Sequence, residues 1–188
     1  MRIAGDVTRA HPPTPANHSS VNRAKRQLTL LLFDYLVSSP VSTPLRRLEG
    51  ISYWVIEDPT AIRDFINTEV RKEWELDVRS LPGDPAGGDW LPTLSRRKWS
   101  LEVLPIRQIK LNDSIMNFAD AEGEYNFADR LAERRRQLRH AMEAYGRVIW
   151  PIIIRKEDGE VLDGYCRFTT LREMRVSRIY AYVGVLSQ

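Results

Sequence analysis

A run of three isoleucines followed by a turn signal constrains the fold of this chain most strongly. Residues 152–154 form an apolar run with the length of a buried strand. Asp158-Gly159 is a dipeptide typical of tight hairpin turns. Val161 and Leu162 then return as a second, antiparallel strand. The sequence therefore predicts a buried β-hairpin.

Helices and strands are both expected around this hairpin. Residues 101–111 are typical of an extended segment, and residues 127–145 have an amphipathic helical pattern that ends at Gly146. Five residues are expected on the apolar face of that helix: Phe127, Leu131, Leu138, Met142 and Tyr145. A short helix is expected from Gly164 to about residue 174, and a last strand over residues 179–185. This order of elements predicts a small α+β domain.

The pattern divides the chain into three parts. Residues 1–22 are polar, contain three prolines and lack apolar periodicity, which predicts a flexible tail. Residues 23–99 are predicted to be a mostly helical N-terminal region. Within this region, residues 80–92 are rich in proline and glycine and indicate a linker. We therefore expect a domain boundary at this linker, before an α+β domain over residues 100–188.

Three elements are expected inside the N-terminal region. Residues 28–48 contain two helical runs with the loose spacing of a helix-turn-helix. Residues 51–56 are expected to form a short strand. Asp58 and Pro59 then mark the start of a helix as its N-cap and first residue. One face of that helix is apolar: Ile62, Phe65, Ile66, Val70 and Trp74.

Composition excludes several classes of protein. One cysteine in 188 residues excludes a disulfide framework and a zinc site of several thiolates. The formal charge of +3 is too small to indicate nucleic-acid binding unless the positive charge is clustered. No apolar run is long enough to span a bilayer, and the N-terminus lacks the order of a secretion signal. We expect a cytoplasmic protein without a membrane partner.

A basic cluster does occur on the helix predicted over residues 127–145. It consists of five arginines: Arg130, Arg134, Arg135, Arg136 and Arg139. Such a cluster can contact nucleic acid or an acidic protein. A solvated helix face is the alternative interpretation, since no aromatic residues are interleaved for base stacking.

Residues 163–167, Asp-Gly-Tyr-Cys-Arg, carry the clearest signal for chemistry. A strand is expected to end there and a helix to begin, with Arg167 in its first turn, where the helix dipole disfavours a cation unless an anion lies nearby. Free backbone N–H groups and a guanidinium form a phosphate site, and Gly164 allows close approach. Thr169 and Thr170 can add hydroxyl donors. Alternatively, Gly164 is a turn residue and Arg167 pairs with a surface carboxylate.

This element lies in a segment that resembles the ParB/sulfiredoxin superfamily. Residues 151–183 read PIIIRKEDGEVLDGYCRFTTLREMRVSRIYAYV, and residues 101–109 read LEVLPIRQI. The chain shares with the superfamily an order of elements: a first strand, a proline-led strand, a hairpin, a G-x-x-R element that opens a helix, and a closing strand. It covers residues 101–185, under half of the chain. It implies a mixed α+β fold and binding of nucleotide phosphate by Gly164, Tyr165, Cys166 and Arg167.

Three branches of the superfamily differ at this element. Sulfiredoxins place a cysteine two residues before the arginine, where this chain has Tyr165. ParB proteins bind CTP and continue into a helix-turn-helix domain, whereas this sequence ends at Gln188. Free-serine kinases use a D-G-x-x-R element, and residues 163–167 match that form best. The resemblance thus implies a nucleotide-dependent phosphotransferase, using ATP or ADP with Mg²⁺, that acts on a small hydroxyl-bearing metabolite.

The kinase resemblance also implies residue roles. Asp163 would orient the acceptor hydroxyl and take its proton, and Asp113 would be a second acidic residue. Magnesium needs only one or two carboxylates from a protein, and no dedicated set of metal ligands is expected. Asp163 can instead cap the short helix. Trp150 can stack on the nucleotide base or simply pack in the core.

Two other functions remain open at the level of sequence. The chain can be a non-catalytic, nucleotide-responsive ParB-like module that binds DNA or a protein through its arginine-rich helix. It can also use the fold as a scaffold without any nucleotide site, since a fold does not fix a function.

Overall fold

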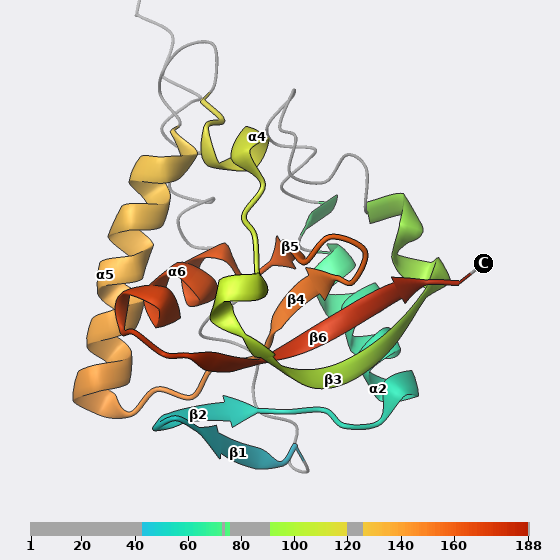
Figure 1. Ribbon diagram of the computed structural model, residues 1–188, viewed down its shortest axis with the longest axis horizontal. Coiled ribbons are helices and arrows are strands. Elements are labelled where there is room, and N and C mark those ends of the chain that lie inside the picture. Colours follow the sequence, from blue (N-terminus) through green and yellow to red (C-terminus); the bar gives the residue numbers. More distant parts are fainter. Residues whose placement is uncertain (1–42, 73, 76–90, 120–125, 188) are drawn as a thin grey trace, which may run out of the picture. The chain divides into compact units, whose positions relative to one another are not determined.

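The computed structural model describes residues 43–72, 74–75, 91–119 and 126–187, which all belong to one compact unit, Ser42–Gln188 (Figure 1). The strands are β1 (Leu45–Leu48), β2 (Ile51–Trp54), β3 (Arg97–Pro105), β4 (Ile152–Arg155), β5 (Glu160–Asp163) and β6 (Arg178–Leu186). The α-helices are α2 (Pro59–Phe65), α4 (Asp113–Met116), α5 (Phe127–Tyr145) and α6 (Tyr165–Glu173). Other helical turns are η1 (Ile66–Val70), η3 (Leu91–Arg96) and η4 (Ile106–Gln108). The predicted α+β class is confirmed. The tail predicted over residues 1–22 and the helix predicted from residue 28 lie outside the described residues.

A four-stranded mixed sheet with the order β3-β6-β4-β5 forms the centre of the unit (Figure 1). β6 pairs antiparallel with β3 and parallel with β4, while β4 and β5 form the predicted antiparallel hairpin. Ile152, Ile153 and Ile154 are all buried, as their apolar run predicts. Strands buried on both faces read as continuous apolar runs, which explains why this segment lacks alternation.

β3 differs from its predicted limits. The prediction placed an extended segment over residues 101–111, whereas the strand begins at Arg97 and η4 follows Pro105. Arg97 is buried despite its charge, because its guanidinium donates to both Glu157 carboxylate oxygens (3.0 and 2.9 Å) and to the Gly184 carbonyl (3.1 Å). A partner sixty residues away therefore allows a buried cation to begin this strand.

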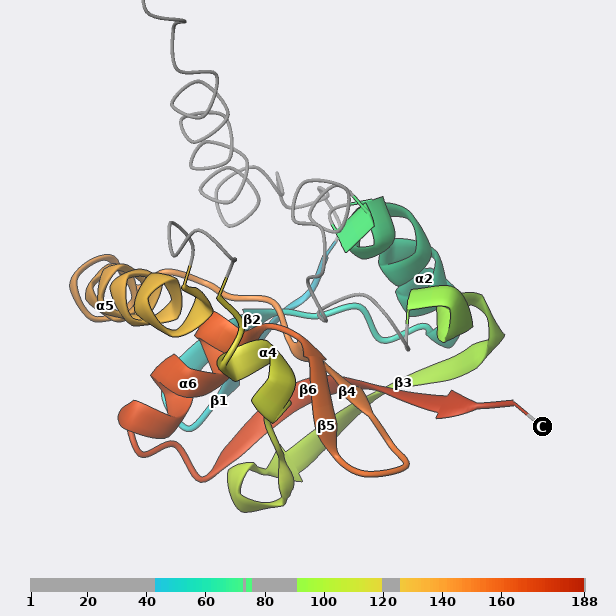
Figure 2. The same ribbon diagram turned by 90° about the horizontal axis from the view of Figure 1, so that it is seen from above.

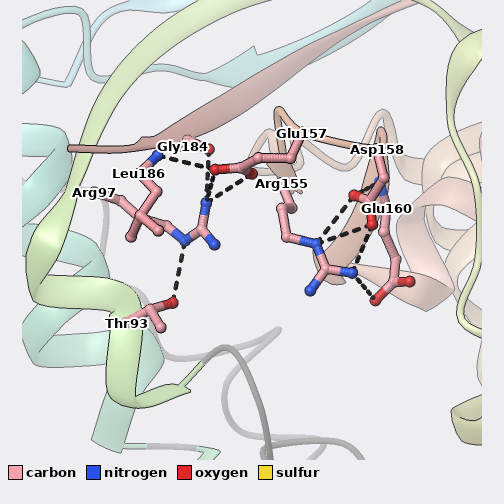
Figure 3. Close-up of polar contacts among 8 residues, drawn as sticks. All are labelled: Thr93, Arg97, Arg155, Glu157, Asp158, Glu160, Gly184 and Leu186. Atoms are coloured by element: carbon pink, nitrogen blue, oxygen red, sulfur yellow. Dashed lines mark hydrogen bonds and ion pairs between the residues drawn. The ribbon is translucent and has the colours of Figure 1, made fainter. Parts of the chain in front are cut away.

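Two separate ionic contacts involve the β4–β5 hairpin, one with β3 and one within the hairpin itself (Figure 3). Arg97 holds Glu157, whose carboxylate also accepts the Leu186 N–H (3.0 Å). Burial alone would raise the pKa of Glu157, but backbone N–H groups and the Arg97 guanidinium hold this pKa below its usual range. Arg155 pairs with Asp158 within the turn at 2.7 Å and also contacts Glu160.

The N-terminal segment is less helical than predicted. Residues 45–48 were expected in a helical run, but they form strand β1, which pairs antiparallel with the predicted strand β2. The reason is the turn between them, since Glu49 and Gly50 both have positive φ (50° and 84°). Two successive residues with positive φ give the tight hairpin turn that matches strand twist.

The helix predicted after Asp58 is confirmed. The Asp58 carboxylate accepts the Ala61 N–H at 2.8 Å, and Pro59 is the first residue of α2. The helix continues through the π-helical turn η1. Four residues of its predicted apolar face are buried: Ile62, Ile66, Val70 and Trp74.

The segments on either side of the predicted linker share one hydrophobic core. Tyr53 and Ile62 are fully buried in the same cluster as Ile152. The Tyr182 hydroxyl of β6 accepts the Ile56 N–H at 2.9 Å. The boundary expected at residues 80–92 therefore does not separate two cores among the described residues.

Helices α5 and α6 lie side by side against the sheet (Figures 1 and 2). α5 spans the predicted residues and ends at Gly146, which adopts a left-handed conformation (φ 62°). Arg135 and Arg139 of α5 both pair with Glu173 of α6, at 2.9 and 3.1 Å. The prediction that Tyr145 faces the core is wrong, because this residue is 79% exposed. Tyr145 is the last residue of α5, directly before the Gly146 cap, where the side chain is open to solvent.

Candidate functional site

The N-terminus of α6 is where the sequence places the phosphate-binding element. Gly164 occupies the N-cap position with φ 95°, in the left-handed region that favours glycine, and no side chain caps the helix. A Cβ on Gly164 would lie 2.9 Å from Ile152 Cγ2 and about as close to the Arg167 guanidinium. Backbone conformation and packing thus both require glycine here, independently of any ligand.

Arg167 and Asp163 form an ion pair at this helix end. The guanidinium lies 2.6 Å from the Asp163 carboxylate and also donates to the carbonyl oxygens of Trp150 (3.2 Å) and Pro151 (3.1 Å). Both side chains are largely covered, with 15% of Arg167 and 18% of Asp163 exposed. The predicted phosphate ligand and the predicted catalytic carboxylate therefore contact each other directly. Arg167 therefore pairs with a carboxylate, as the alternative interpretation of the sequence expected, although this carboxylate is only partly exposed.

The side chains around this pair are directed to packing rather than to solvent. Tyr165 is buried with its ring against Phe127, and burial raises the pKa of its phenol. The Thr169 hydroxyl donates to the carbonyl oxygens of Tyr165 and Cys166, at 2.8 and 3.1 Å. Thr170 is fully buried. Hence, besides the Arg167 guanidinium, α6 offers a ligand the backbone N–H groups of its first turn, and neither threonine hydroxyl is exposed.

Trp150 links this end of α6 to the N-terminal segment. Its indole stacks on Phe65 of α2, with ring centroids 4.9 Å apart, and Phe65 also contacts the Tyr182 ring. One face of Trp150 is therefore covered by an aromatic ring from the region that was expected to be a separate domain. In this contact Trp150 packs against another side chain of the protein, which corresponds to the second interpretation of this residue.

Asp113 lies in the first turn of α4, exposed, behind the N-cap Asn112. The Asn112 side-chain amide donates to Glu160 of β5 at 3.0 Å, which attaches this segment to the edge of the sheet. The structure records no contact that joins Asp113 to Asp163. Within residues 43–72, 74–75, 91–119 and 126–187, no group of three or more His, Cys, Asp or Glu gathers as a metal site.

The arginine cluster of α5 is largely paired. Arg136 contacts Glu133, and Arg139 contacts Glu143 at 2.8 Å besides Glu173. Arg135 contacts Glu173 as well. Exposed ion pairs of this kind add little stability, but each one neutralises a charge that a phosphate backbone would need. The surface of α5 is consequently less basic than its arginine content suggests.

A separate cavity of about 360 Å³ lies beside the β4–β5 turn. Its lining includes Lys110, Ile154, Gly159 and Val183. None of residues 163–167 lines it. The cavity and the α6 N-terminus are thus two different places on the unit.

Comparison with known proteins gives fold-level matches alone. No protein-family model and no curated protein matches the sequence. Two solved structures of a pNOB8-like ParB N-domain match 48% of the chain, with 16% and 15% identity and a TM-score of 0.34 each. The chain spans about a third of the length of those structures, 32% and 29%. No helix of the described residues is long and apolar enough to cross a membrane.

Two partners of the site were not anticipated from sequence. The carbonyl groups of residues 150 and 151 have no sequence signal, because every residue has a carbonyl. Phe65 was expected only on an apolar helix face. The Asp163–Arg167 contact was not anticipated by the helical four-residue rule either, because Asp163 ends β5 and Gly164 separates it from α6.

Proposed function

We propose that this chain is a nucleotide-responsive binding module of the ParB/sulfiredoxin kind, and that the first turn of α6 takes the nucleotide phosphates. The proposal rests on one observation: no side chain caps the N-terminus of α6, and the Arg167 guanidinium lies beside Gly164. Backbone N–H groups, the helix dipole and an arginine together suit an anion. The order of β4, β5, α6 and β6 also matches the order that the sequence resemblance implies.

Asp163 determines how such a site would work. A phosphate that approaches α6 must compete with the Asp163 carboxylate for Arg167, because the two side chains are 2.6 Å apart. A ligand would therefore replace one anion by another on the same guanidinium. This competition supports a switch that responds to nucleotide. The arginine-rich face of α5 is the proposed contact for DNA or an acidic protein, whose anionic groups would have to displace Glu133, Glu143 and Glu173 from the arginines that they pair with.

Calorimetric titration with ATP, ADP, CTP and GTP, each with and without Mg²⁺, tests the proposal. A ligand at 100 times its Kd stabilises a fold by about 2.7 kcal/mol, which raises the Tm of a chain of this size by about 5–10 °C. Arg167→Gln should abolish binding, whereas the matched control Arg172→Gln, at an exposed position of the same helix, should keep it. Asp163→Asn should tighten binding, because Arg167 loses its competing partner. Weaker binding in Asp163→Asn, or no binding by wild type, would refute the proposed site.

Phosphotransfer is the second candidate, and the same Asp163 carboxylate supports it. When phosphate takes Arg167, Asp163 is released next to the ligand, where it can accept a proton from an acceptor hydroxyl. Mg²⁺ and Asp113 would complete such a site. The two candidates differ in one variant: for a phosphotransferase, Asp163→Asn loses ATP or ADP turnover with hydroxyl-bearing metabolites while it still binds nucleotide.

A further inference from the structure

The outer edge of β3 is a second surface of interest. β3 is an edge strand of nine residues that pairs with β6 on one side only. Among the described residues, no backbone hydrogen bond joins β3 to any segment other than β6. Edge strands with unpaired N–H and C=O groups are templates for a further strand.

The hydrogen-bond pattern shows which backbone groups face outward. The Ser187 N–H donates to Arg96 O, and the Ile106 N–H donates to Ser177 O, so residues 96 and 106 bond toward β6. Antiparallel pairs alternate between hydrogen-bonded and non-hydrogen-bonded positions. Even-numbered residues of β3 therefore bond to β6, and odd-numbered residues direct their N–H and C=O to the outer edge. Pro105 fits this assignment, since proline has no N–H to donate and is tolerated at edges.

The side chains of β3 have opposite charges on one face. Lys98, Ser100 and Glu102 alternate with the odd residues and therefore share a face of the sheet. Lys98 is exposed at one end of this set, while Glu102 lies at the other end and binds Ser100 Oγ and Lys156. A two-fold rotation of the strand about Ser100 therefore places Lys98 where Glu102 was and Glu102 where Lys98 was.

We propose that two copies of this chain associate through their β3 edges, antiparallel and two-fold symmetric about Ser100. In this register the outward-facing residues meet as hydrogen-bonded pairs, Trp99 with Leu101 of the second copy and Arg97 with Val103 of the second copy. Lys98 lies opposite Glu102 of the second copy, and symmetry repeats that pair. A register one residue further, about Leu101, places Lys98 opposite Leu104 and loses both ion pairs. Val103, which is 42% exposed in the single copy, gains cover. The proposal is independent of the nucleotide site.

Charge reversal gives a direct test by sedimentation velocity over a wide concentration range. Wild type should show a reversible, concentration-dependent dimer. Lys98→Glu and Glu102→Lys alone should each weaken self-association about tenfold or more, because each places two like-charged pairs across the two-fold axis. A mixture of the two variants should form a heterodimer, because both cross-strand pairs are then opposite in charge. Lys72→Glu, an exposed reversal outside the sheet, should leave self-association unchanged.

A backbone readout tests the edge itself. Val103→Pro removes one outward N–H and leaves the bonds to β6 intact, so the variant should stay folded by circular dichroism and self-associate less. Amide exchange of Trp99, Leu101 and Val103 should slow as wild-type concentration rises, whereas Lys98 and Ser100 should be protected at every concentration. A wild type that is monomeric throughout, or a dimer that survives both reversals and Val103→Pro, would overturn the proposal.

Discussion

Substitution of Gly164 by alanine tests whether packing against β4 fixes the start of α6. Alanine at a left-handed position costs about 1–2 kcal/mol. A Cβ at Gly164 adds a contact of 2.9 Å to Ile152 Cγ2, well inside the ordinary carbon separation of about 3.5–4.0 Å. Ile152 is buried in β4 and cannot move freely, so overpacking adds about 1–3 kcal/mol. The expected total is about 2–5 kcal/mol, or about 4–20 °C in Tm.

Gly146→Ala is the matched control for this prediction. Gly146 also has positive φ (62°), but no atom lies within 4 Å of an added Cβ. Gly146→Ala should therefore lower the free energy of unfolding only by the cost of alanine in the left-handed conformation, about 1–2 kcal/mol. The reduced entropy of the unfolded chain affects both variants equally and cancels in the difference. Chemical denaturation of wild type and both variants gives that difference. Equal destabilisation would refute the argument that the contact with Ile152 matters.

Three further predictions concern stability. Ser177 and Arg178 donate hydrogen bonds that lower the pKa of Glu49 to about 2, so Glu49→Gln should destabilise the protein above about pH 4.5 and lose this effect toward pH 2, as measured by urea unfolding at several pH values. Gly184→Ala should cost about 1–3 kcal/mol, since its Cβ would lie 2.6 Å from the Trp99 ring; an unchanged Tm would contradict this contact. Leu138→Ala should lower the free energy of unfolding by about 2–5 kcal/mol in the same denaturation assay. Tyr145→Ala, at the exposed end of α5, should change it by less than about 0.5 kcal/mol.

Local signals in the sequence predicted much of the fold correctly. The Asp58 cap, the Asp158-Gly159 turn and the Gly146 helix end each depend on neighbours within a few residues. Long-range contacts were not predictable in this way. Arg97 is buried only because Glu157 lies beside it, and the Ile56 N–H reaches a hydroxyl 126 residues away. The core shared by described segments on either side of residues 80–92 was not predictable for the same reason, since no local pattern reports that two segments pack together.

For the candidate site, too, the local features were predicted from the sequence and the long-range contacts were not. The turn at Gly164 and the helix behind it follow from local chemistry, and the sequence located both. The geometry that decides their chemistry is not local, because Arg167 also binds the carbonyls of residues 150 and 151. The roles expected of Thr169 and Thr170 assumed exposed hydroxyls, but both side chains face the packed interior of the unit. Periodicity in a nine-residue helix buried on most of its surface does not show which side is open.

The position of β6 has a consequence for how the protein folds during synthesis. β6 lies between β3 and β4 in the sheet, yet it follows both of them in the chain. While residues 178–186 are still inside the ribosome, β3 and the β4–β5 hairpin have no strand between them, and their apolar faces stay without a partner. Domains fold as units once their parts have emerged. The isoleucines of β4 then lack the neighbour that β6 provides until the last central strand emerges.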